Sequence, residues 1–94
     1  HNRKNDLHEP SFDGKTVTII PEVRAALDQF VGAGFMAAHR PYEEGGQQLP
    51  WSLLQGCFAC FNAANVASTG YAFLTIGAAN LIGAFGNADQ KARY

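Results

Sequence analysis

The fold is decided by residues 50–85, which read PWSLLQGCFACFNAANVASTGYAFLTIGAANLIGAF. No charged side chain occurs between Glu44 and Asp89. All of the charged side chains therefore lie outside this stretch. The chain has 94 residues, which is long enough for one domain. A domain of this size buries only a modest fraction of its surface, so its core is thin unless other protein covers it.

Two helices are predicted within this stretch, at about residues 50–68 and 70–85, with a break at Thr69–Gly70. Both are apolar on nearly every face, which is typical of helices buried in a large core or in lipid. The large apolar residues and cysteine that define them are Leu53, Leu54, Cys57, Phe58, Phe61, Val66, Tyr71, Phe73, Leu74, Ile76, Leu81, Ile82 and Phe85.

A membrane hairpin is one interpretation of these helices. A span needs about 20 apolar residues, whereas residues 70–85 are fewer, and Asn62, Asn65 and Asn80 are costly in hydrocarbon. No basic cluster or aromatic belt flanks the run. We therefore expect no membrane span, and we expect further protein, either more of a parent chain or a second copy, to cover the helices.

An amphipathic helix is predicted at about residues 21–33. Pro21 suits the first helical position and Glu22 complements the helix dipole. Gly32 or Gly34 is expected to end the helix in a left-handed cap. One stripe faces the core and consists of Val23, Ala26, Leu27, Phe30 and Val31.

The two ends of the chain differ. Residues 1–20 are expected to form an exposed lead-in, in which residues 16–20 (TVTII) lie as an extended arm because no second strand is visible. Residues 21–94 are expected to form part of a helical domain. Asn87 reads as an N-cap with Gln90 at the third helical position, which starts a helix over 87–94.

Charge and cysteine content exclude several classes of function. The net charge of −1, without a basic face, argues against a nucleic-acid partner. Residues 57–60 (CFAC) have the spacing of a redox pair or of half a zinc site, but no further ligands stand at a suitable spacing. We expect these thiols to pack as small hydrophobic groups in a reducing cytoplasm, and we expect no metal site.

Several motifs occur in a characteristic order. Residues 85–94 read FGNADQKARY, which resembles the G-x-x-x-Q-K-x-x-Y segment of the flavin-dependent acyl-CoA dehydrogenases. Residues 34–35 (GF) and 41–46 (PYEEGG) are similar to its glycine-plus-hydrophobe turn and its acidic, aromatic Gly-Gly loop.

Three further motifs narrow this resemblance to one branch of the family. Residues 12–15 (FDGK), Pro21 and residues 48–50 (QLP) resemble the large branch that includes 3-methylmercaptopropionyl-CoA dehydrogenases. Two positions depart from the family pattern, since Glu44 stands where an aromatic residue usually precedes the glycine pair and Gln48 stands at a position often held by glycine.

The resemblance implies an all-α helical-bundle fragment of the N-terminal domain, with an extended N-terminal arm. It implies that the parent, usually a tetramer, uses FAD to oxidise the Cα–Cβ bond of an acyl-CoA, a carboxylate taking the α-proton and flavin N5 the β-hydride. The FAD-contacting segments and the catalytic glutamate lie beyond Tyr94 in that family, so no catalytic or cofactor-binding residue is assigned here. Thr69, Phe73 and Gly77 match positions that line the acyl pocket.

Other functions remain open on the sequence. The main alternative is a non-catalytic helical module that binds a partner through its apolar faces, followed by the membrane hairpin. Glu43 and Glu44 could be read as an acid–base pair, although adjacent carboxylates in a loop are usually only solvated. The expected partners are an acyl-CoA substrate through the whole enzyme, the rest of the parent chain and further copies of it.

Overall fold

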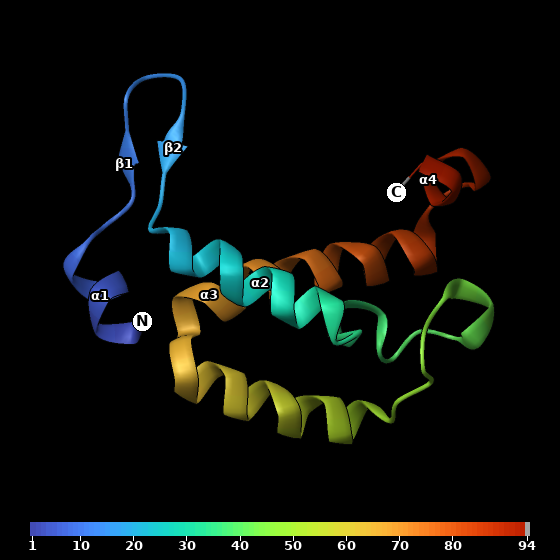
Figure 1. Cartoon of the computed structure of the whole chain (residues 1–94). Helices are drawn as coiled ribbons and strands as arrows, with labels where there is room; N and C mark the ends of the chain where they lie inside the picture. Colours follow the sequence, from blue (N-terminus) through green and yellow to red (C-terminus); the bar gives the residue numbers. More distant parts are fainter. Residues whose placement is uncertain (94) are drawn as a thin grey trace.

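The protein is all-α, as predicted from the sequence, apart from one short hairpin (Figure 1). The structure is a computed structural model that describes residues 1–93. Two 3-10 turns, Phe35–Ala37 and Tyr42–Glu44, lie in the loop that joins the second and third helices. The elements in chain order are α1 (Asn2–Leu7), β1 (Ser11–Phe12), β2 (Val17–Thr18), α2 (Pro21–Gly32), α3 (Trp51–Phe85) and α4 (Ala88–Arg93).

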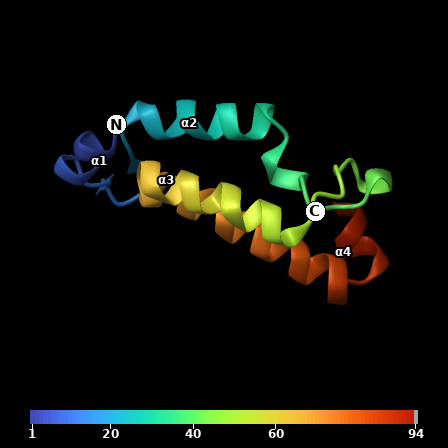
Figure 2. The ribbon, with the colours of Figure 1, turned by 90° about the horizontal axis from the view of Figure 1, so that it is seen from below.

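Helix α3 is bent sharply at Asn65, whose backbone leaves the helical region with φ −166° and ψ 102°. The bend divides α3 into a first arm (51–64) and a second arm (66–85), which fold back beside each other under α2 (Figures 1 and 2). The predicted break at Thr69–Gly70 was therefore placed too late. Gly70 lies inside the second arm, and a Cβ at Gly70 would meet only open space.

The side chain of Asn65 explains why the break occurs there. Its Oδ1 accepts a hydrogen bond from the backbone N–H of Ser68 at 2.7 Å, which is the geometry of an N-cap. The first amides of a helix have no partner within the helix, so a residue that satisfies one of them favours a new start. Glycine only allows the backbone to leave the helical conformation, whereas the asparagine side chain also stabilises the helix that follows it.

Helix α2 forms as predicted, with Pro21 in its first turn and Val23 buried. It ends one residue earlier than expected, and Gly34 supplies the left-handed residue (φ 81°) just beyond the end. Val31 was predicted to lie in the core-facing stripe, which is wrong because its side chain is mostly exposed. The stripe is narrower than predicted and includes Val23 and Phe30.

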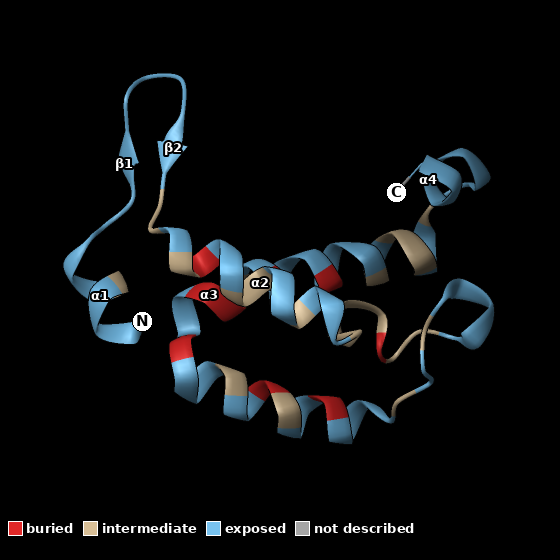
Figure 3. Ribbon diagram, viewed as in Figure 1, coloured by how far each residue is buried: buried red, intermediate tan, exposed pale blue. Residues whose placement is uncertain are grey.

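The core lies where the two arms of α3 meet α2 and the following loop (Figure 3). Leu54 and Phe58 of the first arm contact Ile76 of the second arm and Ala38 of the loop. All four side chains are at least nine-tenths buried. The partly buried residues around them are Phe30, Phe35, Met36 and Leu49. This small core holds the bent helix in one arrangement.

The loop between α2 and α3 depends on unusual backbone conformations. Gly45 has a φ of 78°, and a Cβ on Gly46 would overlap the carbonyl of Arg40. The glycine pair therefore provides both the positive φ and the close approach that the sequence permitted. Gln48 also has a positive φ of 51°, which accounts for glycine being frequent at its position in the family that the sequence resembles.

The lead-in contains more structure than predicted. Val17–Thr18 was expected to lie as an unpaired arm, but it pairs antiparallel with Ser11–Phe12, with Phe12 opposite Val17. The turn forms because the Asp13 carboxylate accepts the backbone N–H groups of Lys15 and Thr16 at 2.8 and 2.7 Å. Residues 2–7 form α1 instead of extended chain. Most of this segment is exposed, as Figure 3 shows.

The start of α4 follows the predicted pattern. Asn87 and Gln90 form a reciprocal capping box, each side-chain oxygen accepting the other residue's backbone N–H at 2.9 Å.

By length and composition α3 could also cross a membrane, because its most apolar window has a mean hydropathy of 1.3. Only 22% of that window is buried within this chain. Much of the apolar surface of α3 therefore lies uncovered.

Candidate functional site

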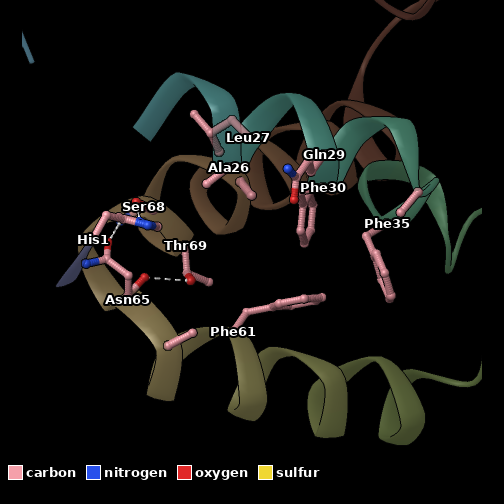
Figure 4. A pocket seen from close by; sticks show the side chains of 13 residues that line it. His1, Ala26, Leu27, Gln29, Phe30, Phe35, Phe61, Asn65, Ser68 and Thr69 are labelled. Carbon is pink, nitrogen blue, oxygen red and sulfur yellow. Dashed lines mark hydrogen bonds between the residues drawn. The ribbon is translucent and has the colours of Figure 1, made fainter. Parts of the chain in front are cut away.

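An open cleft lies between α2 and the bend of α3 (Figure 4). Its volume is about 350 Å³, within the range of small-molecule sites. The lining is mainly apolar, and polar groups gather at the bend. The lining residues are His1, Ala26, Leu27, Gln29, Phe30, Ala33, Phe35, Phe61, Ala64, Asn65, Ser68, Thr69 and Ala72.

Three phenylalanines form one side of the cleft and come from three different elements. Phe30 lies on α2, Phe35 on the loop and Phe61 on the first arm of α3. Their ring centroids are 5.0–5.5 Å apart, and Phe61 meets both other rings edge to face. Such contacts stabilise aromatic pairs beyond simple burial. The cleft therefore has a rigid apolar wall at this side.

The opposite end of the cleft is polar. The hydroxyl of Thr69 donates to the carbonyl oxygen of Asn65 at 2.9 Å, and the Oγ of Ser68 lies 3.2 Å from Nε2 of His1. Figure 4 shows the Thr69 hydroxyl turned toward Asn65 and away from the aromatic side. The Thr69 hydroxyl hydrogen is therefore used within the protein, while the hydroxyl oxygens of Thr69 and Ser68 can still accept hydrogen bonds.

The three residues predicted to line the acyl pocket are not all in this cleft. Thr69 lines it, whereas Phe73 and Gly77 do not. Side chains at positions 69, 72 and 76 of the second arm face inward and are buried, which leaves Phe73 at the flank and 52% exposed. Gly77 is exposed, with open space where a Cβ would be.

Most of the cleft residues that the sequence analysis did not assign to a pocket come from outside the second arm. Phe30 and Phe61 were assigned to the core, and they do pack together while also lining the cleft. The signal for Asn65 was its polar side chain at the head of an apolar helix, an N-cap pattern overlooked in favour of the glycine that follows. Phe35 lies in a loop, where no periodicity could place it.

Few titratable groups reach the cleft. The described residues that line it include His1 but no Lys, Arg, Asp or Glu. The two carboxyl groups with lowered pKa values lie elsewhere. A hydrogen bond from Lys4 lowers the pKa of Glu22 at the start of α2, and backbone N–H groups, chiefly that of Thr16, lower the pKa of Asp13.

A flavin dinucleotide does not fit this cleft. A pyrophosphate is normally held by cationic side chains or by free backbone N–H groups at a helix start. The lining offers no Lys or Arg, and the Ser68 N–H at the bend is already bonded to Asn65. The described residues instead form an apolar recess that suits a hydrocarbon chain.

Two other groups singled out in the sequence lie outside the cleft. Glu44 forms an ion pair with Arg40, which does not suit it to act as a free base beside Glu43. Cys57 and Cys60 are both free thiols, and Cys60 is exposed, so the expectation that both pack internally is wrong for Cys60. Within residues 1–93, no group of three or more potential metal ligands is formed.

Comparison with known families connects this architecture with an enzyme class. Residues 10–94 match the family described as acyl-CoA dehydrogenase, N-terminal domain. A search of curated proteins gave no match. The family match spans the hairpin, α2, the bent helix and the cleft between them. This chain therefore belongs to the acyl-CoA dehydrogenase family, of which it is an N-terminal domain segment.

Proposed function

We propose that the complete protein is an FAD-dependent acyl-CoA dehydrogenase that oxidises the Cα–Cβ bond of an acyl-CoA thioester. Membership of the family is the observation that carries this proposal. The flavin would accept the hydride, and parts of the protein outside this chain would hold it and supply the base. Residues 21–94 would contribute packing and one wall of the acyl pocket. Within the family, residues 12–15, Pro21 and residues 48–50 favour the branch of 3-methylmercaptopropionyl-CoA dehydrogenases.

The pocket wall is proposed to include Thr69, Phe73 and Gly77, which follow each other at intervals of four along the second arm. The position of Thr69 at the cleft supports this proposal. The exposed face of Phe73 and the open space at Gly77 leave room for an acyl chain or for other protein that completes the wall. The apolar lining suits the hydrocarbon part of the substrate.

The uncovered surface of α3 supports two expectations about partners. Large apolar side chains there are more than half exposed, including Val66, Leu74 and Leu81. Surfaces of this kind are normally covered by other protein. We propose that the rest of the parent chain covers them and that the enzyme is a homo-oligomer.

The two free thiols suit the reducing cytoplasm, where we place the protein.

Gly77→Leu tests the pocket wall directly, because a Cβ there meets no other atom of this chain. In the complete enzyme, the added side chain is expected to lower kcat/KM for dodecanoyl-CoA by about 10-fold or more relative to hexanoyl-CoA, since a few methylenes are worth about 1–3 kcal/mol. Gly56→Leu, on the first arm with equal space, is the matched control. Equal effects of Gly77→Leu on both substrates would remove Gly77 from the pocket.

A further inference from the structure

Two free thiols lie on one flank of the first arm of α3, outside the cleft. Cys57 is half-buried, Cys60 is exposed, and they form no disulfide with each other. The backbone of α3 is helical through both residues, since its one departure from helical geometry is at Asn65. Side chains three residues apart on a regular helix are neighbours on its surface. The two thiols therefore lie next to each other on the same flank.

The spacing of this pair suits a bridging ion better than a disulfide. Residues three apart on a helix have Cβ atoms about 5–6 Å apart. A disulfide requires Cβ atoms about 3.5–4.5 Å apart, so a direct bond between the sulfurs would distort the helix. An ion bound by both sulfurs relaxes this requirement, because two metal–sulfur bonds of about 2.3 Å each can span sulfurs up to about 4.6 Å apart.

The surroundings of the two thiols are open and contain no further ligand. Gly56 lies one turn before Cys60 and Ala64 one turn after it, and a Cβ at Gly56 would meet only open space. The first arm contains no His, Asp or Glu, and no group of three or more potential metal ligands forms within residues 1–93. The pair therefore offers an ion two sulfur ligands, which are too few for a structural zinc site with four.

We propose that Cys57 and Cys60 form a two-sulfur site for a soft, thiophilic ion, namely Cu(I). Thiolates select Cu(I), and two of them complete its coordination. The expectation of no metal site rested on the lack of further ligands, which applies to zinc but not to an ion that takes two.

The binding step needs no oxidant or reductant. Both thiols become thiolates, two protons are released, and copper remains Cu(I), so the bound unit carries one negative charge. The exposed position of Cys60 keeps this charge in contact with water. The site is independent of the proposed dehydrogenase activity.

The test is an anaerobic titration of the complete protein with Cu(I), in competition with the chelator bicinchoninate, whose copper complex is coloured. We expect wild type to remove one more equivalent of Cu(I) from the chelator than the double variant Cys57→Ser/Cys60→Ser. Each single variant should bind that equivalent about 100-fold or more weakly, because the second sulfur no longer acts within the same molecule. Circular dichroism checks that each variant is folded.

Two re-spaced variants separate the facing pair from the number of thiols. In a Cys60→Ser background, Ala59→Cys restores two thiols but places them two residues apart, where helical side chains do not face each other. Leu53→Cys instead places the second thiol four residues before Cys57, on the same flank, where Leu53 is 54% exposed. We expect only Leu53→Cys to recover the bound equivalent.

Equal copper binding by wild type and the double variant would overturn the inference. Recovery by Ala59→Cys as complete as that by Leu53→Cys would also overturn it, because binding would then follow the number of thiols and not their spacing. Neither result would bear on the proposed function, which flavin content and activity of the same wild-type protein report separately.

Discussion

The ring centroids of Phe58 and Phe73 lie 6.0 Å apart in an edge-to-face arrangement. The two side chains come from opposite arms of α3. Phe58 is 3% exposed and belongs to the core, whereas Phe73 is 52% exposed. One edge of Phe73 therefore braces the bent helix, and the rest of its ring faces away from this chain. Phe73 therefore combines a packing contact with a large exposed surface.

This dual position leads to a prediction for Phe73→Ala. Because half of the ring is exposed, the variant should lower the free energy of unfolding by only about 1–2 kcal/mol, below the loss for a fully buried phenylalanine. In the complete enzyme it should raise kcat/KM for dodecanoyl-CoA relative to hexanoyl-CoA. Phe85→Ala, also on the second arm and more exposed, is the control. An unchanged chain-length preference would make Phe73 a packing residue only.

A second prediction concerns the loop between α2 and α3. Gly46→Ala should destabilise the protein by about 1–3 kcal/mol, because its Cβ would overlap the Arg40 carbonyl and the loop would have to move. Gly56→Ala should instead stabilise it by about 0.5–1 kcal/mol, because Gly56 lies in regular helix with open space around it. Urea denaturation of both variants checks this pair. Equal shifts in the same direction would contradict the proposed close approach.

The sequence predicted those elements whose signals are local. Pro21 and the apolar spacing that follows it located α2, and the Asn87–Gln90 capping pattern located α4. The hairpin was not predicted because two-residue strands are too short to show an alternating pattern, although Asp13-Gly14 is a turn-forming pair.

The bend and the cleft were harder to predict for a physical reason. Asn65 caps the second arm locally, but its buried amide also bonds to Asn2 and Asn5, which are about sixty residues away in the chain. The cleft depends on Phe30, Phe35 and Phe61 converging from three elements. Periodicity within one helix cannot reveal either contact, and it placed Phe73 on the same face as Thr69.

The hairpin turn should respond to pH. The pKa of Asp13 is lowered by backbone N–H groups, first that of Thr16 and then that of Lys15. A lowered folded-state pKa means that the stabilisation is complete above the unfolded-state value and is lost as the pH falls through the folded value. The Thr16 amide shift in NMR should therefore titrate with a midpoint below that of Asp13 in a short unfolded peptide.

The matched variant for this titration is Asp13→Asn, which keeps an acceptor oxygen for both N–H groups but does not ionise in this range. Its Thr16 amide shift should stay constant over the same acidic range. If Asp13 and the unfolded peptide titrated at the same pH, the carboxylate would not be the group that closes the turn.

The uncovered face of α3 predicts self-association of the isolated chain. Leu74 and Leu81 on the second arm and Leu53 on the first are more than half exposed. A symmetric dimer would cover much of this surface. Sedimentation velocity should show concentration-dependent association, which Leu74→Gln weakens and Val17→Gln, in the exposed hairpin, does not. A monomer that persists at the highest soluble concentration would refute this prediction.

Acyl-CoA dehydrogenase activity is tested by the products that the complete protein forms from an acyl-CoA. The purified full-length protein would be incubated with saturated acyl-CoAs, including hexanoyl-CoA and 3-methylmercaptopropionyl-CoA, and with an artificial electron acceptor. We expect flavin in the purified protein, none on the isolated segment, and conversion of at least one thioester to its 2-enoyl product, as detected by mass spectrometry. A full-length protein that binds no flavin and leaves every thioester unchanged would contradict it.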